Sequence, residues 1–233
     1  MTSLRTVVLR DAAAVASAAA ALIATEARAA VECRGRFVMA VSGGRTPWIM
    51  LRALAEEDVP WEAVHVAQVD ERVAPADDPD RNLAHLRESL LAHVPLPPDQ
   101  VHAMPVEAAD LDAAAARYAT TLERIAGTPA VIDLVHLGLG PDGHTASLVP
   151  GDAVQDVADR DVALCGPYQG RRRMTLTFPA INRARRIVFV VTGADKEAVL
   201  ARLRAGDASI PAGRVAAENA MILADADASP EAA

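Results

Sequence analysis

Short, almost wholly apolar runs alternate along this chain with longer segments that have helical spacing. The runs at 135–138 (Val-His-Leu-Gly) and 187–191 (Ile-Val-Phe-Val-Val) are typical of strands covered on both faces, because a strand with one wet face alternates apolar and polar residues. Strands that alternate with helices indicate βαβ units. We therefore predict an α/β fold: a mainly parallel, open, Rossmann-like sheet with helices on both faces.

The same pattern gives the bounds of the expected elements. The expected strands are Thr6–Leu9, Phe37–Val41, Val64–Val69, Ile132–Leu139, Met174–Thr177, Arg186–Val191 and Ala220–Ala224. The expected helices are Asp11–Glu32, Pro47–Glu56, Arg81–His93, Ala108–Ile125, Pro179–Asn182 and Lys196–Arg204. Because no Gly/Ser linker or internal repeat interrupts the chain, we expect one domain over 1–226. The small, polar and acidic residues 227–233 are expected to form a flexible tail.

Composition narrows the class of partner. The net charge of −8 argues against nucleic acid or an anionic membrane as the partner of the whole surface, although it allows a local basic pocket. The Ala-rich segment 12–23 follows Asp11, a typical helix N-cap, and lacks a basic leader, so we expect an amphipathic or buried helix there rather than a signal peptide. Cys33 and Cys165 are far apart in sequence, which favours free thiols in a reducing compartment. We expect a cytoplasmic protein that is a monomer or a weak dimer.

The segment Ser42-Gly43-Gly44-Arg45-Thr46 joins a strand to a helix. The two glycines allow a tight turn and close approach to a ligand. Backbone N–H groups at the start of a helix face anions, and the Ser42 and Thr46 hydroxyls would add donors. The segment is neither a Walker A loop nor a dinucleotide-binding loop. Phosphate binding and an ordinary strand-to-helix turn both remain open on these residues alone.

Charged residues follow the next strand, at Asp70-Glu71-Arg72. They suit either a solvated loop or a site in which Arg72 contacts an anionic oxygen and Asp70 orients a hydroxyl or a catalytic group. Asn82, at the start of the next helix, would supply an amide donor or support the loop.

A third polar cluster follows the run that ends at Leu139. Asp142 and His144 lie in a glycine-bounded turn at a strand end, where open α/β proteins place their chemistry. His144 is a candidate general base near neutral pH. Ser147 is a rival nucleophile, but no G-x-S-x-G elbow is present. Water activated by His144 is the simpler hypothesis.

Two basic residues come later in the chain. Arg173 begins a strand after a cluster of arginines that also suits a solvated loop. Lys196 stands at the start of a helix, where the helix dipole disfavours a cation, and this misfit points weakly to use by a ligand.

Together these segments resemble the 6-phosphogluconolactonase family, within the larger group that includes glucosamine-6-phosphate deaminase and ribose-5-phosphate isomerase. The Asp-Gly-His-Thr-Ala-Ser-Leu stretch is highly specific for the family, and the Ser-Gly-Gly loop is moderately so. The matching segments are Ser42–Pro47, Asp70–Arg72 with Asn82, Gly138–Gly151, Arg173–Thr177 and Thr192–Lys196.

The resemblance implies the phosphosugar isomerase/deaminase fold and a carboxylic ester hydrolase of the pentose phosphate pathway. Such an enzyme hydrolyses 6-phospho-D-glucono-1,5-lactone to 6-phospho-D-gluconate without a cofactor or a metal. His144 would be the general base, with Asp142 and Asp70 near it, and backbone N–H groups of the 140–145 turn would stabilise the oxyanion. Arg72 would contact the phosphate or the lactone. The phosphate would be held by Ser42, Gly43, Gly44, Arg45, Thr46, Arg173 and Lys196.

The sequence departs from the family pattern at Arg45 and Arg81, where many relatives carry Ser, and at Val149, where many lactonases carry Phe. Deaminases of the group typically have a glutamate at the position of Val149 and Asp-Glu-Tyr at 70–72, so both differences favour a lactonase. A deaminase-like activity remains an alternative. So does a sugar-phosphate-binding effector module, although such modules usually carry a helix-turn-helix and this acidic chain begins almost directly with the fold.

Overall fold

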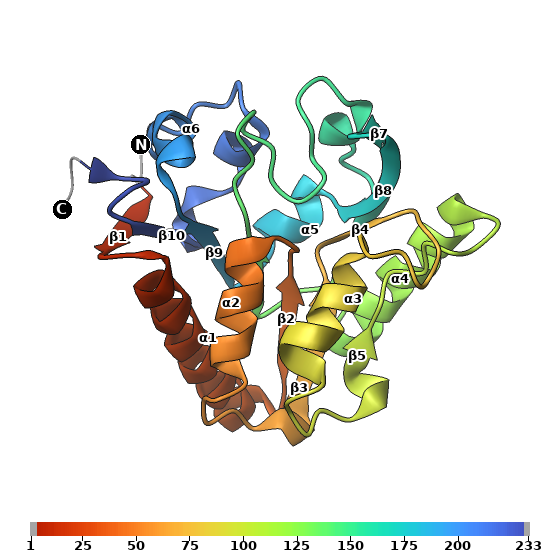
Figure 1. Ribbon diagram of the computed structural model, residues 1–233. Helices are drawn as coiled ribbons and strands as arrows, with labels where there is room; N and C mark the ends of the chain where they lie inside the picture. Colours follow the sequence, from red (N-terminus) through yellow and green to blue (C-terminus); the bar gives the residue numbers. More distant parts are fainter. Residues whose placement is uncertain (1–3, 231–233) are drawn as a thin grey trace.

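The computed structural model describes residues 4–230, and its centre is a seven-stranded sheet (Figure 1). The strand order is β1-β10-β9-β6-β2-β3-β5, and every neighbouring pair is parallel. The sheet-forming strands are β1 (Arg5–Leu9), β2 (Phe37–Val41), β3 (Val64–Gln68), β5 (Val101–His102), β6 (Leu134–Leu137), β9 (Arg186–Val191) and β10 (Ala220–Asp225). The predicted α/β class with a mainly parallel sheet is confirmed.

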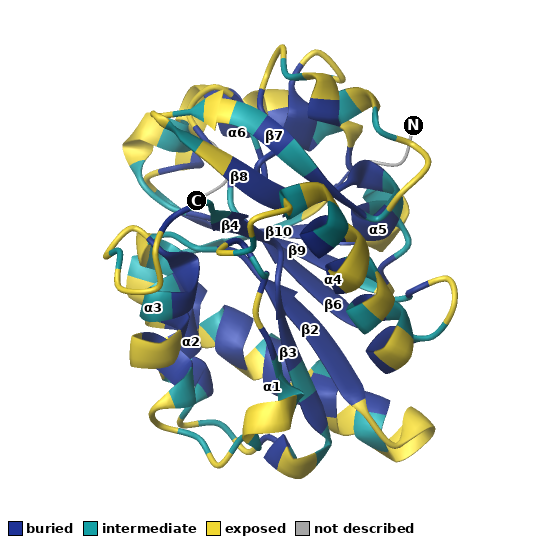
Figure 2. Ribbon diagram, turned by 90° about the vertical axis from the view of Figure 1, so that its right-hand side faces the viewer, coloured by how far each residue is buried: buried dark blue, intermediate teal, exposed yellow. Residues whose placement is uncertain are grey.

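Successive residues of a strand point to opposite sides of the sheet, and here both sides are apolar. Helices therefore cover both faces of the sheet. In β2, Phe37, Met39 and Val41 pack with one face's helices, and Val38 and Ala40 belong to the cluster on the other face. The first face carries α1 (Ala12–Arg34), α2 (Arg45–Leu54) and α3 (Asn82–Leu86), and the second carries α4 (Leu111–Ala126), α5 (Phe178–Asn182) and α6 (Glu197–Arg204). The inner strands β2, β6, β9 and β10 are buried almost along their length (Figure 2), whereas the edge strand β1 is partly exposed.

Helix α1 is a core helix, as expected. Its Asp11 cap accepts a hydrogen bond from the Ala14 N–H, and Gly35 ends the helix with a φ of 73°. Within residues 4–230, α1 alone is long and apolar enough to cross a membrane by length and composition, but its apolar residues pack on the sheet. Near its end Cys33 is exposed, whereas Cys165 is buried.

A second, smaller sheet stands beside the carboxyl ends of the large one. It contains β4 (Asp70–Arg72), β8 (Arg171–Leu176) and β7 (Val162–Tyr168), in the order β4-β8-β7, all antiparallel. The strand predicted at Met174–Thr177 therefore belongs here and not to the parallel sheet. β4 and β7 were not predicted, because β4 is a run of three charged residues and β7 contains Gly166 and Pro167.

The expected tail is packed as far as it is described. Ala228 and Ser229 are buried, and the Ser229 Oγ accepts a hydrogen bond from Arg204 Nη1 at 2.8 Å. These contacts do not test flexibility, so the flexible tail from residue 227 stays a prediction, and residues 231–233 lie outside the described residues.

The order of the strands fixes where a ligand can bind. From β2 the chain goes on to β3 on one side, whereas β6, on the other side of β2, is followed by β9 in the opposite direction. At such a reversal the segments that leave neighbouring strands diverge and open a crevice at the carboxyl edge. The loops after β2 and β6, which hold two of the predicted polar clusters, meet at this point.

Candidate active site

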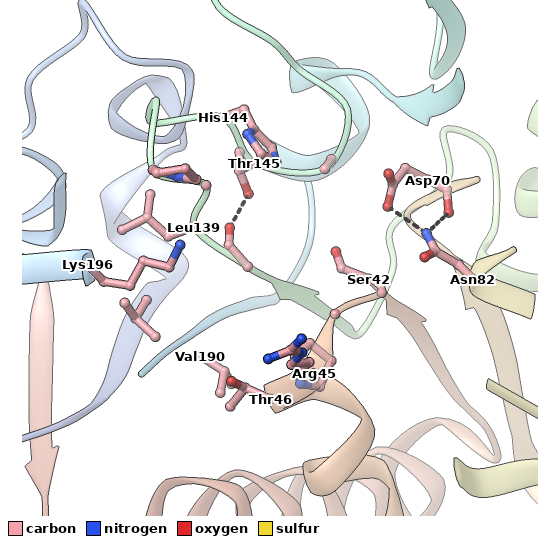
Figure 3. Close-up of a pocket in the computed structure, with 18 of the residues that line it drawn as sticks. Ser42, Arg45, Thr46, Asp70, Asn82, Leu139, His144, Thr145, Val190 and Lys196 are labelled. Atoms are coloured by element: carbon pink, nitrogen blue, oxygen red, sulfur yellow. Dashed lines mark hydrogen bonds between the residues drawn. The ribbon is translucent and has the colours of Figure 1, made fainter. Parts of the chain in front are cut away.

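A cavity of about 540 Å³ opens at this edge of the sheet. Figure 3 draws its lining as sticks, with Lys196 and Asp70 on opposite sides and His144 across from Thr46. The predicted site residues that line it are Ser42, Gly43, Gly44, Arg45, Thr46, Asp70, Arg72, His144, Arg173 and Lys196. Asp142 lies behind His144 and contacts its ring.

The Ser42–Thr46 loop depends on its two glycines. Gly44 has a φ of 126°, a conformation that side chains rarely allow. A Cβ on Gly43 would collide with the Asn82 amide, so the loop lies directly against Asn82. The turn delivers the start of α2 to the cavity, where the first backbone N–H groups have no helical partner. Thr46 Oγ1 lies 2.7 Å from Thr192 Oγ1, which ties the loop to the end of β9.

His136 in β6 holds the start of this loop from the core. Its Nδ1 accepts a hydrogen bond from the Ser42 N–H at 3.3 Å, and the Ser42 Oγ donates to the His136 carbonyl at 3.0 Å. His136 is fully buried, and burial lowers its pKa to about 4, so the ring is neutral and can accept. No sequence pattern indicates this role, since His136 lies within an apolar run.

Asp70 is buried and bonded to its neighbours. Its Oδ2 accepts a hydrogen bond from Ser147 Oγ at 2.6 Å, and Asn82 Nδ2 donates to its backbone carbonyl at 3.0 Å. Asp70 therefore contacts Ser147 rather than His144. Ser147 is fully buried and does not line the cavity, which excludes it as a nucleophile in this conformation.

Glu71 has a structural role that the sequence did not reveal. Its side chain is fully buried, and its carboxylate accepts hydrogen bonds from the Gln68 side chain and from the backbone N–H groups of Arg72, Asn82 and Leu83. Arg81 Nε lies 3.2 Å from its Oε2, also buried. The carboxylate thus satisfies the start of α3 and fixes Arg72 and Asn82 at the cavity.

His144 lies with Asp142 and Tyr168 at the rim. Asp142 Oδ1 is 2.6 Å from His144 Nδ1, and the Tyr168 hydroxyl donates to Asp142 Oδ2 at 3.1 Å. Partial burial raises the pKa of Asp142, but the hydrogen bonds from His144 and Tyr168 outweigh it, and the pKa lies below its usual value. An ionised carboxylate only accepts, so the Nδ1 carries a proton, and in the neutral ring the lone pair is then on Nε2.

Two glycines make room for this histidine. The Gly140 N–H donates to the His144 carbonyl at 2.8 Å, and a Cβ on Gly140 would collide with the imidazole ring. Gly143 has a φ of 85°, and a Cβ on it would collide with the side chain of Ile210. Its N–H donates to the Gly140 carbonyl, and the His144 N–H donates to Asp142. These three N–H groups are therefore already used within the turn, and an oxyanion role for its other N–H groups, those of Asp142 and Thr145, stays a prediction.

The cavity is rich in cations. Arg72 in β4 and Arg173 in β8 are directly paired residues of the antiparallel ladder. Burial lowers the pKa of Arg173, and the charge of Arg72 lowers it further against the opposing effect of Asp70. Arg173 Nε is buried without a hydrogen-bond partner among the described residues. Lys196 lies 3.1 Å from Asp195. Two like charges directly opposite each other are unfavourable unless an anion joins them.

Sequence reasoning missed the hairpin that joins β7 to β8. Its turn residues Gln169 and Gly170 have φ values of 52° and 80°, which is the conformation of a tight hairpin turn. Gln169 lines the cavity and Tyr168 reaches His144. The Gln-Gly pair was the available signal, but it is weaker than the Asn-Gly that such turns prefer. Among residues 4–230, no group of three or more His, Cys, Asp or Glu could hold a metal ion.

Comparisons with known proteins agree with this geometry. Residues 10–223 match the family model described as glucosamine-6-phosphate isomerases/6-phosphogluconolactonase. A 6-phosphogluconolactonase of Synechocystis sp. is 41% identical over 190 residues, which are 80% of this chain and 79% of the relative. One of Mycobacterium tuberculosis is 41% identical over 214 residues, 86% of this chain and 87% of the relative.

A solved structure extends the likeness to the fold. The 6-phosphogluconolactonase from Trypanosoma cruzi superposes with a TM-score of 0.87 at 26% identity, covering 98% of this chain and 96% of that one. Further relatives are named as chloroplastic and endoplasmic proteins, so membership sets no compartment. With its sequence, fold and loop geometry in agreement, the chain belongs to the glucosamine-6-phosphate isomerases/6-phosphogluconolactonase family, and within it to the 6-phosphogluconolactonases.

Proposed function

We propose that this cavity hydrolyses 6-phospho-D-glucono-1,5-lactone, with His144 as the general base. The observation that carries the proposal is that the His144–Asp142 pair and the facing pair of Arg72 and Arg173 border one cavity. The first pair suits activation of water, and the second suits an anion.

Recognition of the phosphate is supported by charge. The whole chain has a net charge of −8, yet the cavity lining holds four Lys or Arg side chains against two Asp. The α2 N-terminus and the Thr46 hydroxyl add neutral donors, whereas the Ser42 hydroxyl donates to the His136 carbonyl. A phosphate held there would fix the far end of the sugar, so that its binding energy orients the lactone carbonyl.

The chemistry is a water addition followed by ring opening. His144 Nε2 takes a proton from water while the water oxygen bonds to C1, and the carbonyl oxygen becomes an oxyanion. The C1–O5 bond then breaks, and the ring oxygen receives the proton from His144. The N–H groups of Gly140, Gly143 and His144 are occupied, and we propose that the guanidiniums of Arg72 and Arg173 at the cavity contribute to stabilising the oxyanion.

The deaminase alternative lacks its proton carrier in this chain. The related deaminases typically have a glutamate at the position of Val149. In this chain Val149 is buried and does not line the cavity. An effector module would bind a sugar phosphate without turnover. The proposal expects turnover of the lactone and none of glucosamine 6-phosphate.

The test is an assay of the purified chain, corrected for spontaneous lactone hydrolysis. We expect hydrolysis of the phosphorylated lactone at a kcat/KM far above that for unphosphorylated gluconolactone. Ser147→Ala separates the two nucleophiles: it retains hydrolysis if water attacks and abolishes it if Ser147 does. Binding without turnover, or equal use of the unphosphorylated lactone, would refute the proposal.

The remaining expectations stay proposals. We propose that the protein works in the cytoplasm and is a monomer or a weak dimer, with the small phosphosugar lactone as its partner. Light scattering at several protein concentrations would test the oligomeric state.

A further inference from the structure

The β7–β8 hairpin brings one side chain to the back of the proposed base. Tyr168, the last residue of β7, places its hydroxyl 3.1 Å from Asp142 Oδ2 and 3.3 Å from His144 Nδ1. Its ring meets the His144 ring edge-on, with the centroids 5.1 Å apart. Tyr168 itself does not line the cavity. Any effect that it has on the substrate therefore passes through the residues that it touches: Asp142 and His144 by its hydroxyl, and Arg173 by its ring.

The hydrogen bonds in this cluster have one consistent direction. Asp142 uses Oδ1 for His144, through Nδ1 and through the backbone N–H, and uses Oδ2 for Tyr168. With its second oxygen held, the carboxylate cannot rotate away from the imidazole. A fixed carboxylate keeps the proton on Nδ1 and directs the Nε2 lone pair toward the cavity.

The same hairpin also contacts the cationic side of the cavity. The Arg173 guanidinium stands 5.1 Å from the centroid of the Tyr168 ring, and its Nη2 donates to Gln169 Oε1 at 3.1 Å. The tight turn at Gln169 and Gly170 keeps Tyr168 and Arg173 on the same short ladder. Tyr168 is thus fixed from the side opposite Asp142 as well.

We infer that Tyr168 is a positioning residue for the lactone hydrolysis: its hydroxyl holds the Asp142 carboxylate that orients His144. The inference rests on the proposed function, because it assumes that His144 is the base. Its specific content is that the hydroxyl, and not only the ring, contributes to kcat, and that it does so only while Asp142 carries a carboxylate.

The test is a double-mutant cycle on the full chain with Tyr168→Phe and Asp142→Asn. Tyr168→Phe keeps the ring contacts with His144 and Arg173 and removes the hydroxyl. We expect kcat to fall about 3- to 30-fold with KM changed less than about twofold, and no further fall when Tyr168→Phe is added to Asp142→Asn. An unchanged kcat, or the same fall in both backgrounds, would overturn the inference.

A matched control and a second readout keep the result clear. Tyr118→Phe removes the hydroxyl of a buried tyrosine that bonds Gln68, and it should lower stability but not kcat. The second readout is the ¹⁵N spectrum of the imidazole rings, in which His144→Gln identifies the signals of His144. In the wild type these signals should show the proton on Nδ1. In Tyr168→Phe they should show a mixture of the two tautomers. Identical spectra would also overturn the inference. If His144→Ala were fully active, the proposed function itself would fail, a result separate from these.

Discussion

Two charged clusters follow β3 and β6, the strands on either side of β2, and they differ in how many of their hydrogen bonds are used inside the protein. The Glu71 carboxylate is fully buried, bonds a side chain and three backbone N–H groups, and pairs with Arg81. The His144 ring uses only Nδ1 and lies partly exposed at the cavity, and its Nε2 makes no hydrogen bond within residues 4–230.

This difference distinguishes a residue that stabilises the structure of the site, Glu71, from one that takes part in its chemistry, His144. A charge whose partners are all internal has nothing left to offer a substrate, and its loss costs stability. A group with one atom turned to the cavity can exchange a proton there. Both clusters look alike in the sequence, as polar residues after an apolar strand, so the predictions below test whether this distinction holds.

The largest effect is expected at Glu71. Glu71→Gln leaves Arg81 without its buried partner and replaces a carboxylate that accepts from several N–H groups, so the free energy of unfolding should fall by about 3–5 kcal/mol. Glu107→Gln is the control, since this second partner of Arg81 is 54% exposed and should cost less than about 1 kcal/mol. Urea unfolding measures both. Equal losses would remove the distinction between the buried and the exposed pair.

The next effect is a loss of stability in acid that comes from His136. Its pKa is lowered by burial from 6.5 to about 4, so the unfolded chain binds a proton that the folded chain refuses between these values. The contribution, roughly 3 kcal/mol, is present above pH 6.5 and is lost as the pH falls toward 4.

His136→Asn tests this directly, because the amide oxygen can still accept from the Ser42 N–H but does not titrate. Its free energy of unfolding should fall less than that of the wild type between pH 6.5 and 4.5. Parallel curves for the two proteins would show that His136 is not the group responsible.

A smaller effect is expected when the base is displaced without being removed. A Cβ on Gly140 meets the His144 ring, and Gly140 is not among the positive-φ residues, so Gly140→Ala acts through this contact alone. We expect kcat to fall about 100-fold, the usual consequence of a misplacement near 1 Å. Gly138→Ala, whose Cβ meets no atom within 4 Å, should lose much less. Comparable losses would contradict the steric argument.

The smallest effect is expected at Lys196, which lies across the cavity from Asp70. Lys196→Ala should raise KM for the phosphorylated lactone about tenfold and leave the slow reaction of unphosphorylated gluconolactone unaltered. An equal change for both lactones would assign Lys196 to the fold rather than to the phosphate.

Sequence patterns predicted the parallel sheet well, because its strands are short apolar runs that periodicity detects. Phe37–Val41 and Arg186–Val191 have the predicted bounds. Two strands of the second sheet, β4 and β7, escaped detection because they depend on long-range partners: β4 is three charged residues that pair with β8 about a hundred positions away. Local propensity contains no information about such pairing.

The candidate residues were predicted as a set of strand ends, and ten of the eleven line the cavity while Asp142 contacts His144. What could not be predicted is how they bond. Asp70 bonds Ser147 instead of His144, and Tyr168 reaches Asp142 only through the hairpin. These contacts depend on the second sheet, whose strands were not all foreseen.

The central claim is that His144, with one nitrogen facing the cavity, is the base of the reaction. Its most direct test is the kcat of His144→Ala on 6-phosphogluconolactone, measured beside the free energy of unfolding of the same variant. We predict a loss of about 10²–10⁴-fold in kcat with unfolding changed by less than about 1 kcal/mol. Hydrolysis at the wild-type rate by a folded His144→Ala protein would contradict the account.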